Sequence, residues 1–241
     1  MAVRVFGLAH FQIIIVEFIY QDEYFVAINK PNGLLVHRSN IASDASEFAL
    51  QLVRDALGQY VYPVHRLDRK TSGVLVFALS ADIARKLQES MESGAVQKRY
   101  LAIVRGFFPD EINLVHPLTN EKGKLQDAET FFSCINRSEL EIAFGKHASS
   151  RYSLIEAFPK TGRMHQIRRH LDHLRHPIIG DRPWGCNKQN KLFLEKWNMN
   201  TMLLHAISMS IPHPINTQMI EINAEMPAEF KRMLHELRLE L

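Results

Sequence analysis

Hydrophobic residues in several short runs of the chain alternate with polar ones, a period typical of half-buried strands. Strands are predicted at residues 24–28, 61–64, 74–79, 100–104, 140–144, 152–158, 203–211 and 219–222. The apolar run at 13–16 is also predicted as a strand. It is too short to span a bilayer, and no small-residue cleavage site follows it. We therefore expect no membrane segment.

Apolar positions three or four residues apart predict four helices. They are a helix capped by Ser43 or Asp44 and ended by Gly58, a helix capped by Ser80 and ended by Gly94, a helix over about 163–174, and a helix that begins at Pro227. Strands outnumber helices and do not alternate regularly with them. The prediction is an α+β fold with a mixed, largely antiparallel central sheet flanked by helices. Residues 107–150 give the weakest pattern.

Composition adds only broad limits. The chain has 241 residues, of which 46% are hydrophobic and 23% charged, as in an ordinary globular protein. Its net charge of +3 does not by itself separate an RNA-binding protein from a metabolic enzyme. Cys134 and Cys186 are far apart and match no metal-binding spacing. We interpret them as reduced thiols of a cytoplasmic protein.

The run HRLDRKTSG at 65–73 carries the first candidate chemistry. It lies between two predicted strands, where a loop on a rigid sheet can present a reactive group. Asp68 stands between Arg66 and Arg69, whose positive charges favour the ionised carboxylate that a nucleophile requires. The same residues are also typical of a turn. Locally, the pattern leaves a turn and a nucleophile both open.

The run KTGRMHQIRRHL at 160–171 is the second informative segment. At about 100° per residue, its apolar positions form one stripe of a helix. Arg169 points roughly opposite that stripe and is predicted to be solvated. Arg168 falls beside the stripe and is predicted to be partly buried, so it needs a partner. Asp68 is one candidate partner.

Residues 160–176 form the most concentrated positive segment, with Asp172 as the only acid. Such a segment suits an RNA phosphate backbone, and the alternative is a solvated helix face with ordinary ion pairs. It contains four histidines: His165, His170, His173 and His176. None belongs to a zinc signature, so we predict solvated or RNA-facing histidines and no metal.

Together these segments resemble the RluA-like pseudouridine synthases, which isomerise uridine in RNA. The motifs lie at residues 29–37, 65–73, 98–102, 161–171, 176–181 and 203–206. Their order and spacing resemble the family from about Glu17 to the C-terminus. We therefore expect a catalytic domain at 17–241. Residues 1–16 lie outside the resemblance, as an added edge strand or as sequence before the true start.

The resemblance implies a role for each site residue. Asp68 attacks the target uridine at ribose C1′ or at uracil C6, and Arg168 pairs with Asp68. Tyr100 stacks on the flipped base and its hydroxyl helps to move a proton. Arg66 holds the RNA where the base leaves the stack, and Leu204 packs against the uracil. No cofactor and no metal are implied.

RNA is the expected partner, and Arg163, His165 and Arg169 are predicted to contact it. Residues 168–171 and 174–177 are similar to a tRNA-modifying branch of the family, whose target is uridine 65 in the T stem. Ribosomal RNA as substrate and a role in RNA binding or folding without catalysis are the alternatives. A hydrolase using Asp68 would need a second carboxylate about 5 Å away, and the motifs supply arginines instead. A monomer is expected.

Overall fold

The computed structural model describes residues 2–4, 15–37 and 47–241, which fold into two compact units. Unit 1 comprises Met1–Gln97 and Ala206–Glu225, and unit 2 comprises Lys98–His205 and Met226–Leu241. All the strand registers given for each unit are antiparallel, and helices accompany both sets of strands. The predicted α+β class is confirmed. None of the helices in the described ranges is long and apolar enough to cross a membrane.

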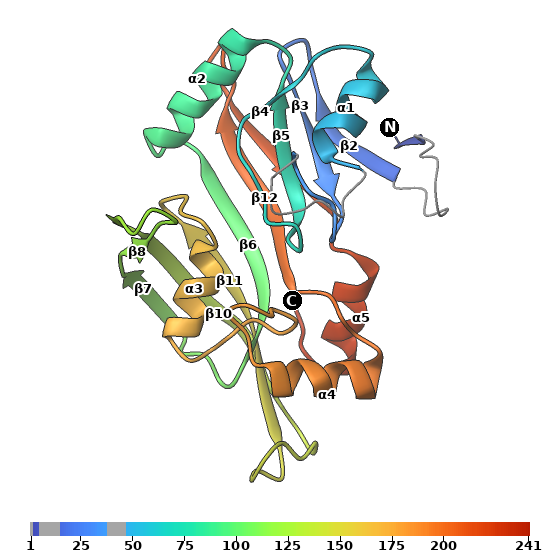
Figure 1. Cartoon of the computed structure of the whole chain (residues 1–241), viewed down its shortest axis with the longest axis vertical. Helices are drawn as coiled ribbons and strands as arrows, with labels where there is room; N and C mark the ends of the chain where they lie inside the picture. Colours follow the sequence, from blue (N-terminus) through green and yellow to red (C-terminus); the bar gives the residue numbers. More distant parts are fainter. Residues whose placement is uncertain (1, 5–14, 38–46) are drawn as a thin grey trace. The chain divides into compact units, whose positions relative to one another are not determined.

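Unit 1 is built around strands β3 and β5 (Figure 1). Its strands follow the order β1 (Ala2–Arg4), β2 (Ile15–Gln21), β3 (Phe25–Lys30), β5 (Ser72–Ala78), β12 (Leu204–Pro212) and β13 (Met219–Asn223), with β4 (Tyr62–Pro63) also paired to β5. Its helices are α1 (Ala49–Leu57) and α2 (Ala81–Glu92). All seven residues of β5 are buried, as expected for a strand covered on both faces.

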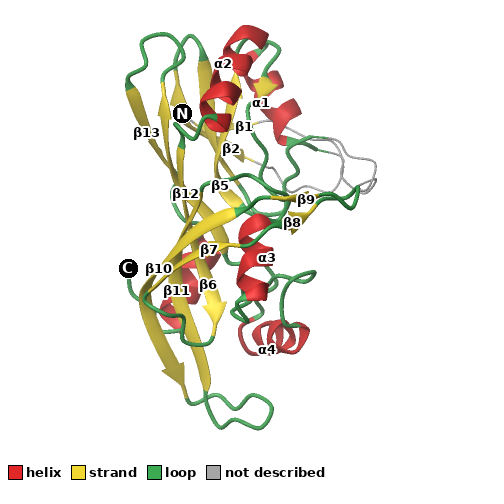
Figure 2. Ribbon diagram, turned by 90° about the vertical axis from the view of Figure 1, so that its left-hand side faces the viewer, coloured by secondary structure: helices red, strands yellow, loops and turns green. Residues whose placement is uncertain are grey.

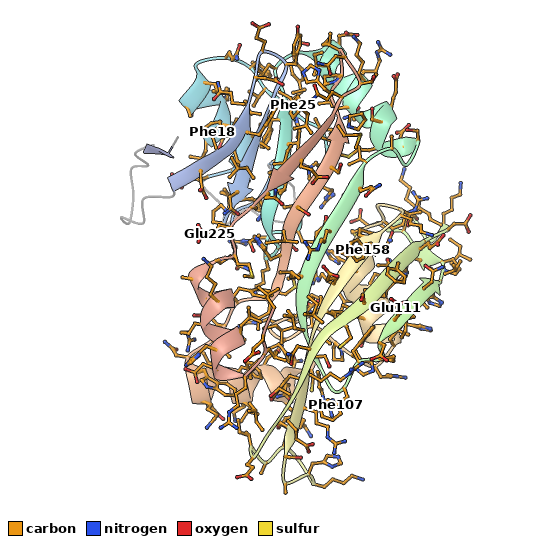
Figure 3. All side chains as sticks on the ribbon, turned by 180° about the vertical axis from the view of Figure 1, so that it is seen from behind. Phe18, Phe25, Phe107, Glu111, Phe158 and Glu225 are labelled. Carbon is orange, nitrogen blue, oxygen red and sulfur yellow. The ribbon has the colours of Figure 1, made fainter. Side chains whose placement is uncertain are left out.

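The core of unit 1 shows the two-residue period of its strands. Phe25 and Ala27 of β3 share a buried cluster with Val74 and Val76 of β5, and α2 adds Leu87 to it. Phe18 on β2 is buried as well, and Figure 3 shows it with Phe25 among the side chains of this unit. These packed strands form the rigid base from which the 65–71 loop rises.

Unit 2 contains a second run of antiparallel strands, labelled in Figure 2. Their order is β6 (Gln97–Arg105), β11 (Ser150–Pro159), β10 (Glu129–Leu140) and β7 (Glu111–Val115), and β8 (Leu118–Thr119) pairs with β9 (Leu125–Gln126) in a small hairpin. Its helices are α3 (Gln166–His173), α4 (Asn187–Trp197) and α5 (Ala228–Glu236). The segment that carries the predicted RNA contacts therefore belongs to unit 2.

Residues 107–150 hold most of what the sequence pattern missed. The strand predicted at 140–144 is wrong, because β10 ends at Leu140 and a loop follows. Strand β10 itself was not predicted. Its register shifts between Cys134 and Asn136, and this bulge interrupts the alternation of inward and outward residues. Helix α4 was missed as well, since it buries only Gln189 and Phe193 and has no continuous apolar stripe.

The start of the chain bears on two further predictions. Strand β1 pairs antiparallel with β2, with Ala2 opposite Glu17. Residues 5–14, which include Ile13–Ile14 of the predicted strand, and the predicted caps Ser43 and Asp44 lie outside the described residues. Helix α1 begins at Ala49, because Phe48 is extended, so the start predicted from a cap at Ser43 or Asp44 is wrong; Gly58 ends the helix in the left-handed conformation, as predicted. The domain boundary at 16/17 stays a prediction.

Gly73 gives a test of the fold next to the candidate loop. Its φ is +110°, and a Cβ atom there would lie 2.1 Å from the carbonyl oxygen of Ala206. We predict that Gly73→Ala lowers the free energy of unfolding by about 3 kcal/mol or more, measured by urea denaturation. Gly123→Ala is the control, because Gly123 also has a positive φ, +76°, but open space around it. It should cost about 1 kcal/mol. Equal losses would contradict the steric explanation.

Candidate active site

The loop at 65–71 joins β4 to β5 and carries Asp68. Leu67 is buried with 6% of its surface exposed, Asp68 is half-buried, and Arg66 is exposed. The amide of Thr71 donates to the carbonyl oxygen of Asp68 at 3.0 Å. The turn that the local sequence predicted is therefore present. The buried Leu67, directly before Asp68, anchors this loop.

The buried side chain of Lys30 is hydrogen-bonded to this loop. Lys30 is the last residue of β3 and is fully buried. Its Nζ donates to the carbonyl oxygens of Pro31 at 2.9 Å, Leu34 at 2.8 Å and Arg69 at 3.2 Å. Three acceptors match the three N–H bonds of an ammonium group. Lys30 thus joins the 31–34 loop to the residue that follows Asp68.

Further bonds connect the same two loops. The amide of Gly33 donates to the carbonyl oxygen of Arg69 at 2.8 Å, and Arg69 Nε donates to the carbonyl oxygen of Gly33 at 3.1 Å. Asn32 Nδ2 donates to the carbonyl oxygen of Lys70. Backbone on both sides is thereby satisfied by direct partners. The position of Asp68 depends on this double connection as much as on its own turn.

Burial lowers the pKa of Lys30 to about 7, and the negative charge of Asp68 acts in the opposite direction. A buried ammonium is costly because it leaves water. A carboxylate close enough to raise its pKa recovers part of that cost. Lys30 and Asp68 therefore belong to one electrostatic unit. Lys30 lies in a motif of the family resemblance, yet neither its residue type nor its spacing predicted a role for it.

Arg168 on α3 is buried, as predicted, with 7% of its surface exposed. Its guanidinium makes a two-pronged contact with Asp181, Nε to Oδ2 at 2.7 Å and Nη2 to Oδ1 at 2.8 Å. Asp181 is 1% exposed and also accepts from the amide of Trp184. Parallel bonds of this kind fix the plane of a guanidinium. Asp181 is thus a partner that the sequence did not predict for Arg168.

A second buried network holds the start of α3 against β10. The side chain of Gln166 accepts from Thr161 Oγ1 at 2.7 Å and from the amide of Arg163 at 3.0 Å. Its Nε2 donates to the carbonyl oxygen of Glu129 and to Thr130 Oγ1, both at 2.9 Å. All four bonds of the amide are made, so the helix start cannot shift without losing them. This arrangement sets where Arg168 lies.

The predicted helix at 163–174 is shorter in the structure. It begins at Gln166, because His165 takes a left-handed conformation with φ of +55°. Arg163 Nε donates to the carbonyl oxygen of Asp127 at 2.9 Å, and Trp184 Nε1 donates to His165 Nδ1 at 3.1 Å. Arg163 and His165 therefore precede the helix and do not lie on one of its faces.

Arg169 is half-buried rather than fully solvated. Its Nη1 donates to the carbonyl oxygen of Thr119 at 2.9 Å, and its guanidinium carbon lies 5.3 Å from the ring centre of Trp184. The structure thus gathers Arg163, His165 and Arg169 around the start of α3 and adds Trp184. No pattern in the sequence indicated this tryptophan.

Tyr100 and Leu204 lie on strands of the sheet. Tyr100 is on β6, opposite Ala157 of β11, and 9% of its surface is exposed. Leu204 begins β12 and is 3% exposed. Asp68 belongs to unit 1, and Tyr100 and Arg168 belong to unit 2, as does Leu204, because unit 1 takes β12 only from Ala206 onward. The pairing of Asp68 with Arg168 stays a prediction.

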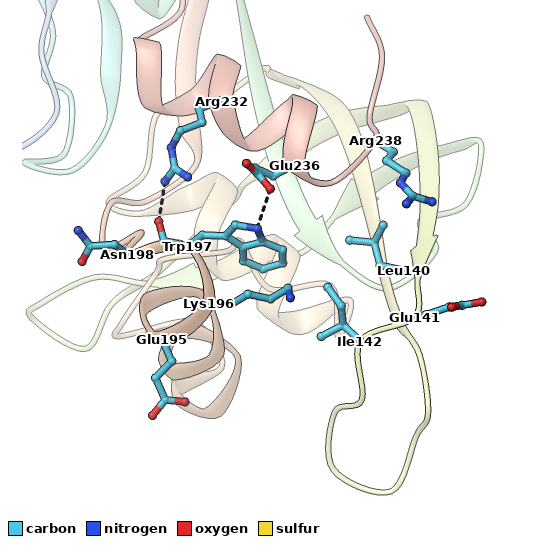
Figure 4. A pocket seen from close by; sticks show the side chains of 10 residues that line it. All are labelled: Leu140, Glu141, Ile142, Glu195, Lys196, Trp197, Asn198, Arg232, Glu236 and Arg238. Carbon is cyan, nitrogen blue, oxygen red and sulfur yellow. Dashed lines mark hydrogen bonds between the residues drawn. The ribbon is translucent and has the colours of Figure 1, made fainter.

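An open recess of about 700 Å³ lies elsewhere in unit 2 (Figure 4). Its lining includes Trp197, whose Nε1 donates to Glu236 at 2.9 Å, and Arg232, which donates to the carbonyl oxygen of Trp197 at 2.8 Å. No residue proposed from the sequence lines it. In the described ranges, no three His, Cys, Asp or Glu side chains are grouped as metal ligands would be.

Comparison with known proteins identifies the family. The family model described as RNA pseudouridylate synthase matches residues 24–173, which include the loop of Asp68, Tyr100 and α3. The chain belongs to the RNA pseudouridylate synthase family. The predicted activity class, isomerisation of uridine in RNA, is confirmed, and RNA is its substrate.

Individual relatives and solved structures agree with this family. The chain is 44% identical over 231 residues to tRNA pseudouridine synthase C of Vibrio cholerae serotype O1, covering 91% of this chain and 95% of the relative. It is 41% identical over 230 residues to the protein of the same name from Haemophilus ducreyi, covering 91% and 95%. The structure titled human RNA pseudouridylate synthase domain containing 4 has a TM-score of 0.71 and 25% identity, covering 93% and 94%. The resemblance found in the sequence motifs is therefore confirmed.

The contacts of Lys30 yield a stability prediction. Lys30→Met removes the donor shared by three buried carbonyl oxygens, so we expect the free energy of unfolding to fall by about 3 kcal/mol or more. Urea denaturation measures this loss. Lys188→Met is the matched control, because Lys188 is exposed on α4, and it should change stability by less than about 0.5 kcal/mol. A Lys30 variant as stable as the control would show that the three hydrogen bonds of Lys30 do not stabilise the fold.

Proposed function

We propose that this enzyme isomerises one uridine of tRNA to pseudouridine, at position 65 in the T stem, with Asp68 as the nucleophile. The observation that carries the choice of tRNA is the 44% identity to tRNA pseudouridine synthase C of Vibrio cholerae over nearly the whole of both chains. The enzyme acts as a monomer in the cytoplasm, in this proposal. The target position and the nucleophile come from the family resemblance and from the setting of Asp68.

The chemistry needs an ionised carboxylate and a base removed from its stack. Asp68 displaces uracil from ribose C1′ or adds to uracil C6. In either route the N1–C1′ bond breaks, a C5–C1′ bond forms, C5 loses its proton and N1 gains one. The reaction is an isomerisation, so it consumes no oxidant, reductant or cofactor. The Lys30 amine supplies positive charge near the carboxylate, together with Arg66 and Arg69, which flank Asp68 in the sequence.

Tyr100, Arg168 and Leu204 complete the proposed site. Extruding the target base costs about a few kcal/mol, and stacking on an aromatic ring such as Tyr100 returns about 1–3 kcal/mol. Arg168 pairs with Asp68 and is itself held by Asp181. Leu204 packs against the uracil. Arg66, Arg163, His165 and Arg169 contact the RNA backbone, where positive charge offsets the cost of extrusion.

Asp68→Asn tests the nucleophile. The variant keeps the size of the side chain and loses its charge, so turnover should fall below detection while RNA affinity stays within about threefold of wild type. Carbodiimide labelling and primer extension map pseudouridine in unmodified tRNA and ribosomal RNA transcripts. Turnover by the variant close to that of wild type would exclude the mechanism.

The same mapping separates the substrates. A stop in the tRNA T stem that requires Asp68 supports the proposal. A stop only in ribosomal RNA keeps the chemistry and rejects tRNA. Binding of both RNAs without a stop in either, together with rescue of a deletion phenotype by the Asp68 variant, favours an RNA-folding role.

Arg168 and Arg169 provide a matched pair of variants on one helix. Arg168→Ala leaves Asp181 buried without its partner and should reduce turnover by at least about 100-fold. Arg169→Ala should mainly weaken RNA binding and reduce the dependence of log Kd on log salt by about one unit. Single-turnover kinetics and binding at several salt concentrations measure the two effects. Equal losses of turnover, or an unchanged salt dependence for Arg169→Ala, would contradict these assignments.

A further inference from the structure

A pair of stacked histidines lies beside α3 and has no part in the reaction described above. The rings of His116 and His173 are 3.9 Å apart between centroids and inclined by only 19°. His173 is on the last turn of α3, and His116 is in the link between β7 and β8. Figure 2 shows α3 beside β7 and the β8–β9 hairpin. The pair thus joins two segments that are far apart in the sequence.

The backbone of His116 is held at both of its polar groups. Its amide donates to the carbonyl oxygen of Ala128 at 3.0 Å, and its carbonyl oxygen is 3.0 Å from His170 Nε2. A carbonyl oxygen only accepts, so His170 Nε2 carries the proton and His170 Nδ1 accepts from Thr130 Oγ1. His170 is fully buried, and burial lowers its pKa. In its neutral form, His170 fixes the backbone of His116 and thereby the place from which the His116 ring projects.

Arg169 brings a permanent positive charge to the same place. It precedes His173 by four residues, so the two side chains are on one side of α3. Its guanidinium reaches Thr119, three residues after His116, and lies over Trp184. These two partners are a carbonyl oxygen and a ring face, neither of which neutralises its charge.

The electrostatics around His116 oppose its protonation in the free protein. The pKa of His116 is lowered by partial burial first, and then by His173 and Arg169. The other charged groups of the neighbouring segments include Asp172 on α3, Arg175 after it, Asp127 before β10, Glu129 on β10, and Glu121, Lys122 and Lys124 in the β8–β9 hairpin. An anion placed against the rings and Arg169 would reverse this effect, because it favours the charged imidazole.

We infer that His116, His173 and Arg169 form a contact for one RNA backbone phosphate, and that the histidine pair takes up a proton when the phosphate binds. The half-exposed His116 and the exposed His173, near a guanidinium that lies over an indole ring, suit a phosphate with an adjacent base or sugar. The identity of the RNA rests on the proposed function. Affinity for RNA should then increase as the pH falls, which fixed arginine or lysine contacts alone do not produce.

The test is the pH dependence of RNA binding. Binding of an unmodified tRNA transcript is measured by fluorescence anisotropy from pH 8 to pH 5.5 at constant salt, with the full chain carrying Asp68→Asn so that no isomerisation occurs. By proton linkage, the parent should bind about fivefold to tenfold more tightly at pH 5.5 than at pH 8. His116→Gln and His173→Gln should each lose most of that gain and bind like the parent at pH 8.

His147→Gln is the matched control, since His147 is exposed in the loop between β10 and β11 and should keep the full pH dependence. Two results overturn the inference. One is a pH dependence in both test variants equal to that of the parent. The other is an affinity lowered by the same factor at every pH, which indicates a contact without proton uptake.

Turnover measured separately distinguishes this inference from the proposed function. With Asp68 intact, wild-type protein is assayed on tRNA at pH 8. If it shows no turnover while the two histidine variants lose the pH-dependent gain in affinity, the phosphate contact stands and the tRNA proposal fails. If turnover occurs but the variants keep the gain, the tRNA proposal stands and the phosphate contact is rejected.

Discussion

The buried amine of Lys30 is the constraint on which the candidate loop depends. An amine with no access to water requires acceptors, and here they are three carbonyl oxygens from two separate loops. Those loops must converge on the end of β3 for the requirement to be met. Asp68 directly precedes Arg69, one of the three acceptor residues. The hydrogen bond from the buried Lys30 amine to Arg69 therefore restricts the position of Asp68.

Unit 2 also contains a buried cationic side chain, but its partner is a carboxylate and not a set of carbonyl oxygens. The buried guanidinium of Arg168 is matched by a carboxylate, Asp181, whose two oxygens fit its planar donors. Gln166 and His170 then fix the helix that carries Arg168, each through bonds that use its full capacity. Such networks add little net stability when complete and cost much when broken. They are better understood as devices that hold one arrangement of the site.

Elements with strong local signals in the sequence were predicted correctly, and elements with weak signals were missed. Strand β5 is buried at every position and has a continuous apolar run, so its pattern was unmistakable. Helix α2 has a serine cap whose oxygen accepts from the amide of Ile83. Strand β10 and helix α4 lack such signals, because a bulge disrupts the first and the second buries few apolar residues. Both are held by neighbours that a local pattern does not contain.

The sequence by itself determined the α+β class, most of the strands, the loop that carries Asp68 and the family, because these depend on local periodicity and on ordered motifs. Only the tertiary structure decided the partners of buried charges. Asp181 lies 13 residues from Arg168, and Arg69 lies 39 residues from Lys30. His173 meets His116 across a larger separation still. Contacts of this kind arise when separate segments pack together, and no period or spacing along the chain encodes them.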